Sequence, residues 1–216
     1  KIVDGAWKNG EPGMIFLDQV NKDNHVGEQY GEMIATNPCG EQPLLGNESC
    51  NLGSINLAKF FQRSTDSTDG WDDKIDWSRL EYVVNTSIHF LDNVIDANKY
   101  ATPEIEKMTK ATRKIGLGIM GFADLLIQLQ IPYSSKLAKE IGVTIMSKIR
   151  NWADKESLKL GELRGTFPAW DNSNYDKQTE RFRNACRLTV APTGTISMIA
   201  DTSSGIEPTF ALVWKK

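Results

Sequence analysis

Apolar residues recur every three or four positions in two stretches of the chain, and this is the spacing of an amphipathic helix. The first stretch runs from Asp76, a candidate N-cap, to about Tyr100 and predicts a helix of about seven turns at 3.6 residues each. Its apolar positions are Leu80, Val83, Val84, Ile88, Leu91, Val94 and Ile95.

Two further helices are predicted towards the C-terminus. One begins at Thr102, with Pro103 at its first helical position. A longer one begins at Ser134 and Ser135. Its apolar positions are Leu137, Ile141, Ile145, Ile149 and Trp152.

Shorter apolar runs between turn-forming residues predict strands. These are the run that follows the Pro/Gly turn in 10–18, the mixed segment 48–61, and the segment Arg187 to Ala191. In the segment 48–61, Cys50 falls on the more polar face. Strands that alternate with long helices indicate an α/β fold, and the lack of a repeat at a fixed period excludes a solenoid.

Composition narrows the class of protein. The 216 residues are 40% hydrophobic and 25% charged, with a net charge of −3, as expected of a soluble globular chain without a basic surface for a nucleic acid polymer. There is no membrane-spanning run and no signal peptide, so a cytoplasmic location is expected. Three cysteines without repeated spacing do not predict a disulfide framework. Because the chain starts without Met, we expect it to be part of a longer protein.

The stretch from Asn37 to Leu57 carries the most chemistry, because two of the three cysteines lie there beside an amide and a carboxylate. In an extended segment Asn37, Cys39 and Glu41 would all project to one side. The residues between them are Pro38 and Gly40, which suit a tight, exposed finger of chain better than the interior of a sheet.

Neither histidine is expected to be catalytic. His25 could act as a base for Cys39, but it lies in a polar stretch that reads as exposed. His89 lies beside the apolar stripe of the first long helix, where a hydrogen-bonded packing role is expected rather than a metal ligand. No metal site is predicted.

Two glycine-containing stretches resemble nucleotide-binding turns. Gly116, Gly118 and Gly121 fit the GxGxxG spacing, but the acid at the expected distance, Glu140, lies inside the long third helix, so we interpret these glycines as sites of close packing between strand and helix. The second stretch follows the predicted strand that begins at Arg187 and could bind a phosphate or be an ordinary capped turn. It consists of Pro192, Thr193, Gly194, Thr195, Ile196 and Ser197.

Four motifs, in order, resemble the catalytic domain of ribonucleotide reductases. They are NPCGE, ESCNLGSINL, RKIGLGIMGFADLL and APTGTIS, and together they span nearly the whole chain. The resemblance implies that residues 1–216 are part of a ten-stranded α/β barrel, made of two five-stranded parallel halves with a central finger loop at residues 37–41.

The resemblance also implies roles for individual residues. Cys39 would become a thiyl radical, Glu41 would accept a ribose hydroxyl proton, and Asn37 would hydrogen-bond the ribose. Cys50 would be half of a reducing cysteine pair. Residues Pro192 to Ser197 would form a loop that holds the substrate phosphates. Cys186 has no matching role and is interpreted as a buried apolar residue.

The same resemblance implies a cofactor and partners. Cys50 follows Cys39 by eleven positions, and this spacing together with NPCGE is similar to the adenosylcobalamin-dependent class. Expected partners are a ribonucleotide, a thioredoxin-like reductant, dNTP effectors, and a complementary N-terminal chain or a homodimer. Because the other reducing cysteine has no match here, the isolated chain is expected to be inactive.

Two alternatives remain open from the sequence. One is a cysteine hydrolase or redox protein that uses Cys39 with His25, without a radical. The other is a non-catalytic split or truncated reductase segment that binds nucleotide or a partner chain.

Overall fold

The structure is a computed structural model that describes residues 1–63, 70–176 and 180–211. In chain order its elements are α1 (Ile2–Asn9), α2 (Leu17–Lys22), α3 (Gly27–Tyr30), β1 (Ala35–Thr36), β2 (Pro43–Leu44), β3 (Asn51–Asn56), the 3-10 turns η1 (Leu57–Phe60) and η2 (Asp72–Lys74), α4 (Trp77–Ala97), α5 (Pro103–Thr112), β4 (Ile115–Met120), α6 (Phe122–Gln128), α7 (Lys136–Arg164) and α8 (Gly194–Ile199). Within those described ranges, no helix has the length and apolar content needed to cross a membrane.

The three predicted long helices begin at their polar capping residues. Asp76, Thr102 and Ser135 each accept a hydrogen bond from the backbone N–H three residues further on, which satisfies a donor that the helix leaves unpaired. Helix α4 ends at Ala97, slightly before the predicted end near Tyr100. The helix starts were therefore predicted correctly from single polar residues.

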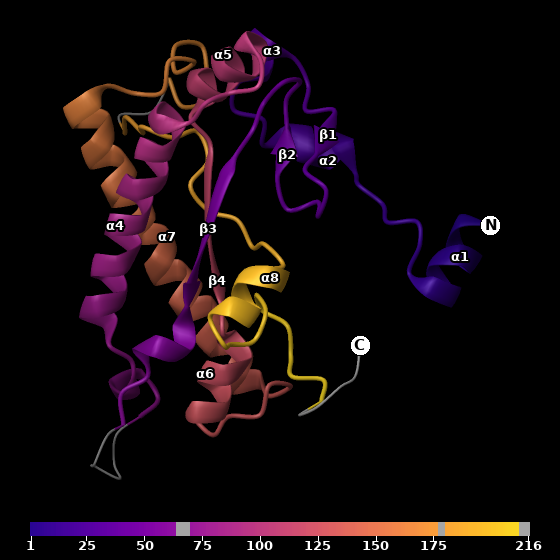
Figure 1. The fold of residues 1–216 in the computed structure, drawn as a ribbon, viewed down its shortest axis with the longest axis vertical. Helices are drawn as coiled ribbons and strands as arrows, with labels where there is room; N and C mark the ends of the chain where they lie inside the picture. Colours follow the sequence, from indigo (N-terminus) through magenta and orange to yellow (C-terminus); the bar gives the residue numbers. More distant parts are fainter. Residues whose placement is uncertain (64–69, 177–179, 212–216) are drawn as a thin grey trace.

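Helices α4 and α7 lie side by side along one flank of the strand pair β3–β4 (Figure 1). The apolar stripe of α4 is buried against it at Leu80, Val84 and Ile88. In α7 the predicted stripe is correct from Ile141 onward, but Leu137 is 40% exposed. In the first turn of α7 the buried position is taken by Ala138, which is 2% exposed, so Leu137 faces away from the core.

Strand β4 is central in the sheet. It pairs in parallel with β3, from Asn51 opposite Ile115 to Asn56 opposite Met120, and on its other side forms a parallel bridge between Leu117 and Leu188. The strand predicted from Arg187 is therefore reduced to a single bridge. The described strands do not close into a barrel.

The two faces of β4 differ. Ile115, Leu117 and Ile119 are buried in the core with α4 and α7. On the other face are Gly116 and Gly118, where a Cβ would lie 2.8 Å from Thr189 Cγ2 and 2.4 Å from Thr189 O, respectively. The glycines thus permit close packing, as predicted, but the neighbouring chain at both positions is the segment around Thr189 rather than a helix.

The N-terminal region differs from its prediction. The apolar residues Met14 to Phe16 form no strand; they are exposed and lead directly into α2. Helix α1, which buries no residue, stands apart from the rest of the chain (Figure 1). From Val26 onward the chain packs on a second apolar cluster around Phe167 and Trp170.

Candidate functional site

The finger is a short antiparallel hairpin. Strands β1 and β2 pair at Ala35 with Leu44 and at Thr36 with Pro43. The turn between them is closed by a hydrogen bond from Gly40 N to Asn37 O (3.0 Å), which places Pro38 at the second turn position that proline favours. Gly40 has a φ of 86°, a left-handed conformation that glycine adopts without strain.

This turn corrects the extended geometry predicted for Asn37, Cys39 and Glu41. The Asn37 side chain points back along the hairpin, where its Oδ1 accepts a hydrogen bond from Gln42 N (3.0 Å). Cys39 is exposed in the turn. The Oε2 atom of Glu41 is fully buried and has no hydrogen-bond partner within the described part of the chain. A buried carboxylate oxygen without a donor is costly unless a ligand supplies one.

The finger lies against the glycine face of β4. Thr189 Oγ1 donates a hydrogen bond to Glu41 O (2.9 Å), and a Cβ at Gly116 would lie 3.1 Å from Gln42 Nε2. Because Thr189 is three residues before Pro192, the finger is anchored to the segment that leads into the predicted phosphate loop.

Cys50 lies directly before β3 and is half-buried, with its thiol donating to Asn51 O (3.6 Å). Burial raises the pKa of the Cys50 thiol, and Cys186, Glu48 and Glu41 act in the same direction, whereas Lys114 lowers it. Glu48 comes from the loop before β3 and Glu41 from the finger, whereas Lys114 directly precedes β4 and Cys186 lies two residues before the bridge at Leu188. Cys50 is therefore a protonated thiol at neutral pH.

The predicted phosphate loop contains the start of α8. The helix begins at Gly194, inside the predicted loop, and Thr193 is its N-cap, in a left-handed conformation with a φ of 58°. Thr193 Oγ1 accepts a bond from Gly205 N (2.7 Å), and the buried Ser197 Oγ is bonded to Ser204 Oγ (2.8 Å). Two of the three hydroxyls are thus engaged within the protein. Pro192, Gly194, Thr195 and Ile196 are exposed.

A carboxylate that the sequence reasoning missed holds the chain after α8. Asp124 Oδ2 accepts hydrogen bonds from Thr202 Oγ1 (2.7 Å) and Ser203 N (2.8 Å). The next residues, Ser204 and Gly205, bond the loop itself. The position of Asp124, third in α6 and shortly after the strand that ends at Met120, was the available signal.

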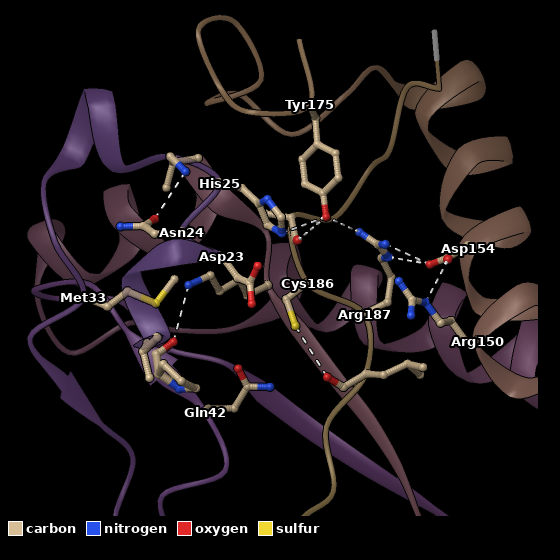
Figure 2. Close-up of a pocket in the computed structure, with 16 residues that line it drawn as sticks. Asp23, Asn24, His25, Met33, Gln42, Arg150, Asp154, Tyr175, Cys186 and Arg187 are labelled. Atoms are coloured by element: carbon tan, nitrogen blue, oxygen red, sulfur yellow. Dashed lines mark hydrogen bonds and ion pairs between the residues drawn. The ribbon is translucent and has the colours of Figure 1, made fainter. Parts of the chain in front are cut away.

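A cavity of about 430 Å³ opens near the amino end of β4 (Figure 2). His25 lines it with its Nε2 3.0 Å from Tyr175 Oη, and Arg187 bridges Tyr175 Oη (3.3 Å) and Asp154 (2.9 Å). Burial, and then the charge of Arg187, lower the pKa of His25. His25 is half-buried rather than exposed, and the described contacts do not join it to Cys39, so they do not support a cysteine hydrolase.

His89 and Cys186 both make hydrogen bonds, but only His89 has the environment predicted from the sequence. His89 Nε2 lies 2.7 Å from Arg164 Nη2, which confirms a hydrogen-bonded role. Cys186 is only half-buried and lines the cavity, so its interpretation as a buried apolar residue is wrong (Figure 2). Its thiol donates to Leu188 O (3.5 Å).

Known proteins resemble this chain along its whole length. Residues 1–183 and 178–216 match the ribonucleotide reductase barrel domain. A vitamin B12-dependent ribonucleoside-diphosphate reductase of Thermoplasma acidophilum is 54% identical over 213 residues, which is 99% of this chain and 27% of that protein. One of the same name from Mycobacterium tuberculosis is 47% identical over 215 residues, which is 100% of this chain and 30% of that protein.

A solved structure shares the fold. The alpha subunit of the class Id ribonucleotide reductase of Actinobacillus ureae has a TM-score of 0.75 and 24% identity, and the match covers 96% of this chain and 38% of that one. The chain spans less than a third of the length of the two B12-dependent relatives. Since the match to the family covers the chain from its first residue to its last, the chain belongs to the ribonucleotide reductase barrel domain family.

Proposed function

We propose that this chain is the part of a ribonucleotide reductase that removes the 2′-hydroxyl of ribonucleoside diphosphates by thiyl-radical chemistry. The observation that carries the proposal is the finger hairpin, where an exposed thiol at Cys39 lies two residues from the buried carboxylate oxygen of Glu41, which has no partner among the described residues. A radical abstraction and a proton acceptor are the two functions that the first half of this reaction needs.

The side chains of the finger divide the first steps among them. The Cys39 sulfur takes the hydrogen atom from the ribose 3′-carbon, and Glu41 accepts the 3′-hydroxyl proton so that the 2′-hydroxyl leaves as water. Asn37 binds the ribose through its amide N–H groups, because its carbonyl oxygen already accepts from Gln42 N. The hairpin therefore orients all three groups from one turn.

The remaining steps use Cys50 and the loop after Thr189. Cys50 and a second cysteine, which has no counterpart among the residues of this chain, supply two hydrogens. The two cysteines end as a disulfide, which a thioredoxin-like dithiol reduces. The substrate phosphates bind the exposed Gly194–Ile196 segment, through the N–H groups that the first turn of α8 leaves free and the hydroxyl of Thr195.

The exposed position of the Cys39 thiol fits adenosylcobalamin, the cofactor implied by the names of the two vitamin B12-dependent relatives described above, because a bound molecule can approach the sulfur directly. When bound, this cofactor supplies a carbon-centred radical able to take the hydrogen atom of a thiol. The complete protein forms the ten-stranded barrel around the finger, works in the cytoplasm, responds to dNTP effectors, and acts as a homodimer or with a complementary chain.

Replacement of Cys39 tests this function in the complete reductase, with adenosylcobalamin, substrate and a dithiol supplied. We expect Cys39→Ser to reduce deoxyribonucleotide formation by about a thousandfold or more, because an O–H bond is too strong for the radical transfer, while the thermal unfolding midpoint stays unchanged. Cys50→Ser should block repeated turnover with the dithiol. Cys186→Ser is the matched control and should keep its activity. Deoxyribonucleotide formation by well-folded Cys39→Ser at the wild-type rate would exclude the proposal.

A further inference from the structure

A buried ion pair flanks Cys50. Lys114 Nζ lies 2.8 Å from Glu48 Oε2, and the side chains are 5% and 0% exposed. Glu48 also accepts hydrogen bonds from Leu45 N (2.9 Å) and Thr112 Oγ1 (2.5 Å). The carboxylate is thus fixed by three donors from two segments of the chain, the loop at Leu45 and the junction between α5 and β4.

The strand register places this pair beside the thiol. Asn51 is opposite Ile115 and Leu52 is opposite Gly116, so Cys50 and Lys114 are the next pair in the same parallel register. Side chains that are opposite in a parallel pair project from the same face. Cys50 and Lys114 therefore meet at the amino end of the sheet, and the ion pair with Lys114 brings Glu48 to the same place.

Lys114 also connects Cys50 with the cavity described above, because it lines that cavity together with Cys186. Its ammonium group has three donors, and the described contacts use two of them, with Glu48 Oε2 and, at 3.5 Å, Pro43 O. One N–H remains for the sulfur of Cys50 or for a molecule in the cavity.

A buried ion pair is not needed for packing here, since apolar side chains of similar size usually stabilise a protein as well or better. In the other buried charge cluster, Asp92 binds three arginines and joins α4 to the end of α7 and to the segments after α5 and α7. That cluster is not among the groups that act on the Cys50 thiol. Only the Lys114–Glu48 pair supplies both a cation and an anion at that thiol in the described part of the chain.

We propose that Lys114, oriented by Glu48, is a positioning residue that stabilises the Cys50 thiolate each time the Cys50 disulfide is reduced. This inference rests on the proposed function, in which Cys50 forms that disulfide. It explains why a cation is placed beside a thiol whose burial otherwise opposes ionisation.

The step balances as an ordinary thiol–disulfide exchange with a dithiol reductant. A thiolate of the reductant attacks the sulfur of the partner cysteine, the S–S bond breaks, and its electron pair leaves on Cys50 Sγ. The second thiolate of the reductant then displaces the partner cysteine and closes the reductant's own disulfide. The two protons of the dithiol end on Cys50 and its partner. Lys114 acts at the first step, because a leaving thiolate departs faster when its charge is stabilised.

The test measures the pH dependence of Cys50 alkylation by iodoacetamide, followed by peptide mass spectrometry, in the reduced complete reductase. Lys114→Met should slow alkylation at pH 8 about tenfold, as for a pKa raised by one unit, and Glu48→Gln should accelerate it. In the oxidised enzyme, Lys114→Met should slow reduction by dithiothreitol by a similar factor. Lys110→Met, which removes the lysine of the exposed 2.6 Å pair with Glu106, is the matched control and should change neither rate.

If the ion pair had only a structural role, Lys114→Met and Glu48→Gln would change the alkylation rate of Cys50 in the same direction, because both would loosen the structure around the thiol. That result would reject the proposal. So would rates equal to the Lys110→Met control. If Lys114→Met fails to fold, the double variant Lys114→Met/Glu48→Gln leaves no charge unpaired and must still react more slowly than Glu48→Gln. The assay needs no turnover, so normal repeated turnover by Cys50→Ser would refute the proposed role of Cys50 without affecting this measurement.

Discussion

The two faces of the β3–β4 pair are built from opposite kinds of residue. The face towards α4 and α7 is filled by branched apolar side chains such as Ile115 and Leu117, which are almost fully buried. The other face has glycines at 116 and 118, so that backbone and the finger can approach it closely. One face stabilises the fold through side-chain packing. The other gives up that packing so that the finger, with its proposed reactive groups, can lie against the sheet.

The largest effect is expected on the glycine face, at the finger. Glu41→Gln should lower turnover in the complete enzyme by about 100-fold to 10,000-fold, the range for loss of a general base. The unfolding midpoint should not fall, because Glu41 Oε2 has no partner to lose among the described residues. Glu162→Gln, on the exposed surface of α7, is the control and should retain full turnover. Wild-type turnover by Glu41→Gln would contradict the view that the glycine face serves the reaction while the other face stabilises the fold.

The second effect lies on the helical face and concerns stability. Ile145 is 1% exposed in the core between α7 and the sheet, so Ile145→Ala should lower the free energy of unfolding by about 2–5 kcal/mol in urea titrations. Substrate turnover by the folded protein at low temperature should be unchanged. Val143→Ala, at a 61% exposed position of the same helix, should cost little. Equal losses in the two variants would show that α7 does not cover this face.

The smallest effect is expected at the phosphate loop. A Cβ at Gly194 meets no atom within 4 Å, so Gly194→Val should fold normally but obstruct phosphate from the backbone N–H groups. We expect the Kd for a ribonucleoside diphosphate to rise about 10-fold to 100-fold by titration calorimetry, as for loss of one or two charge-assisted hydrogen bonds. Gly46→Val is the control, since that position is equally open. Unchanged affinity at Gly194→Val would make the loop an ordinary helix start.

The sequence predicted the helices better than the strands. Asp76, Thr102 and Ser135 fix helix starts through contacts only three residues long, so each start depends on a short stretch of sequence. The run from Met14 to Phe16 has strand-forming residues, yet it remains unpaired because a strand also requires a neighbouring strand. The same reason reduces the strand near Leu188 to one bridge.

At the candidate site, residue types were predictable but their geometry was not. Cys39, Glu41 and Cys50 were identified from their chemistry, while the turn at Pro38 and Gly40 replaced the extended arrangement expected for the finger. The partners of Asp124 and Lys114, in contrast, could not be predicted from the residues around them. Their roles depend on segments separated by 78 and 66 positions, respectively.

The hydrogen bond from Thr189 to Glu41 joins residues 148 positions apart, and this has a consequence for the order of folding. Contacts between distant residues close long loops, which is slow compared with helix formation and with the pairing of helices. The finger can reach its position only after β4 and the segment that ends at Thr189 have assembled. During synthesis, the chain therefore carries Cys39, the proposed radical cysteine, on an unanchored hairpin until most of the domain has been made.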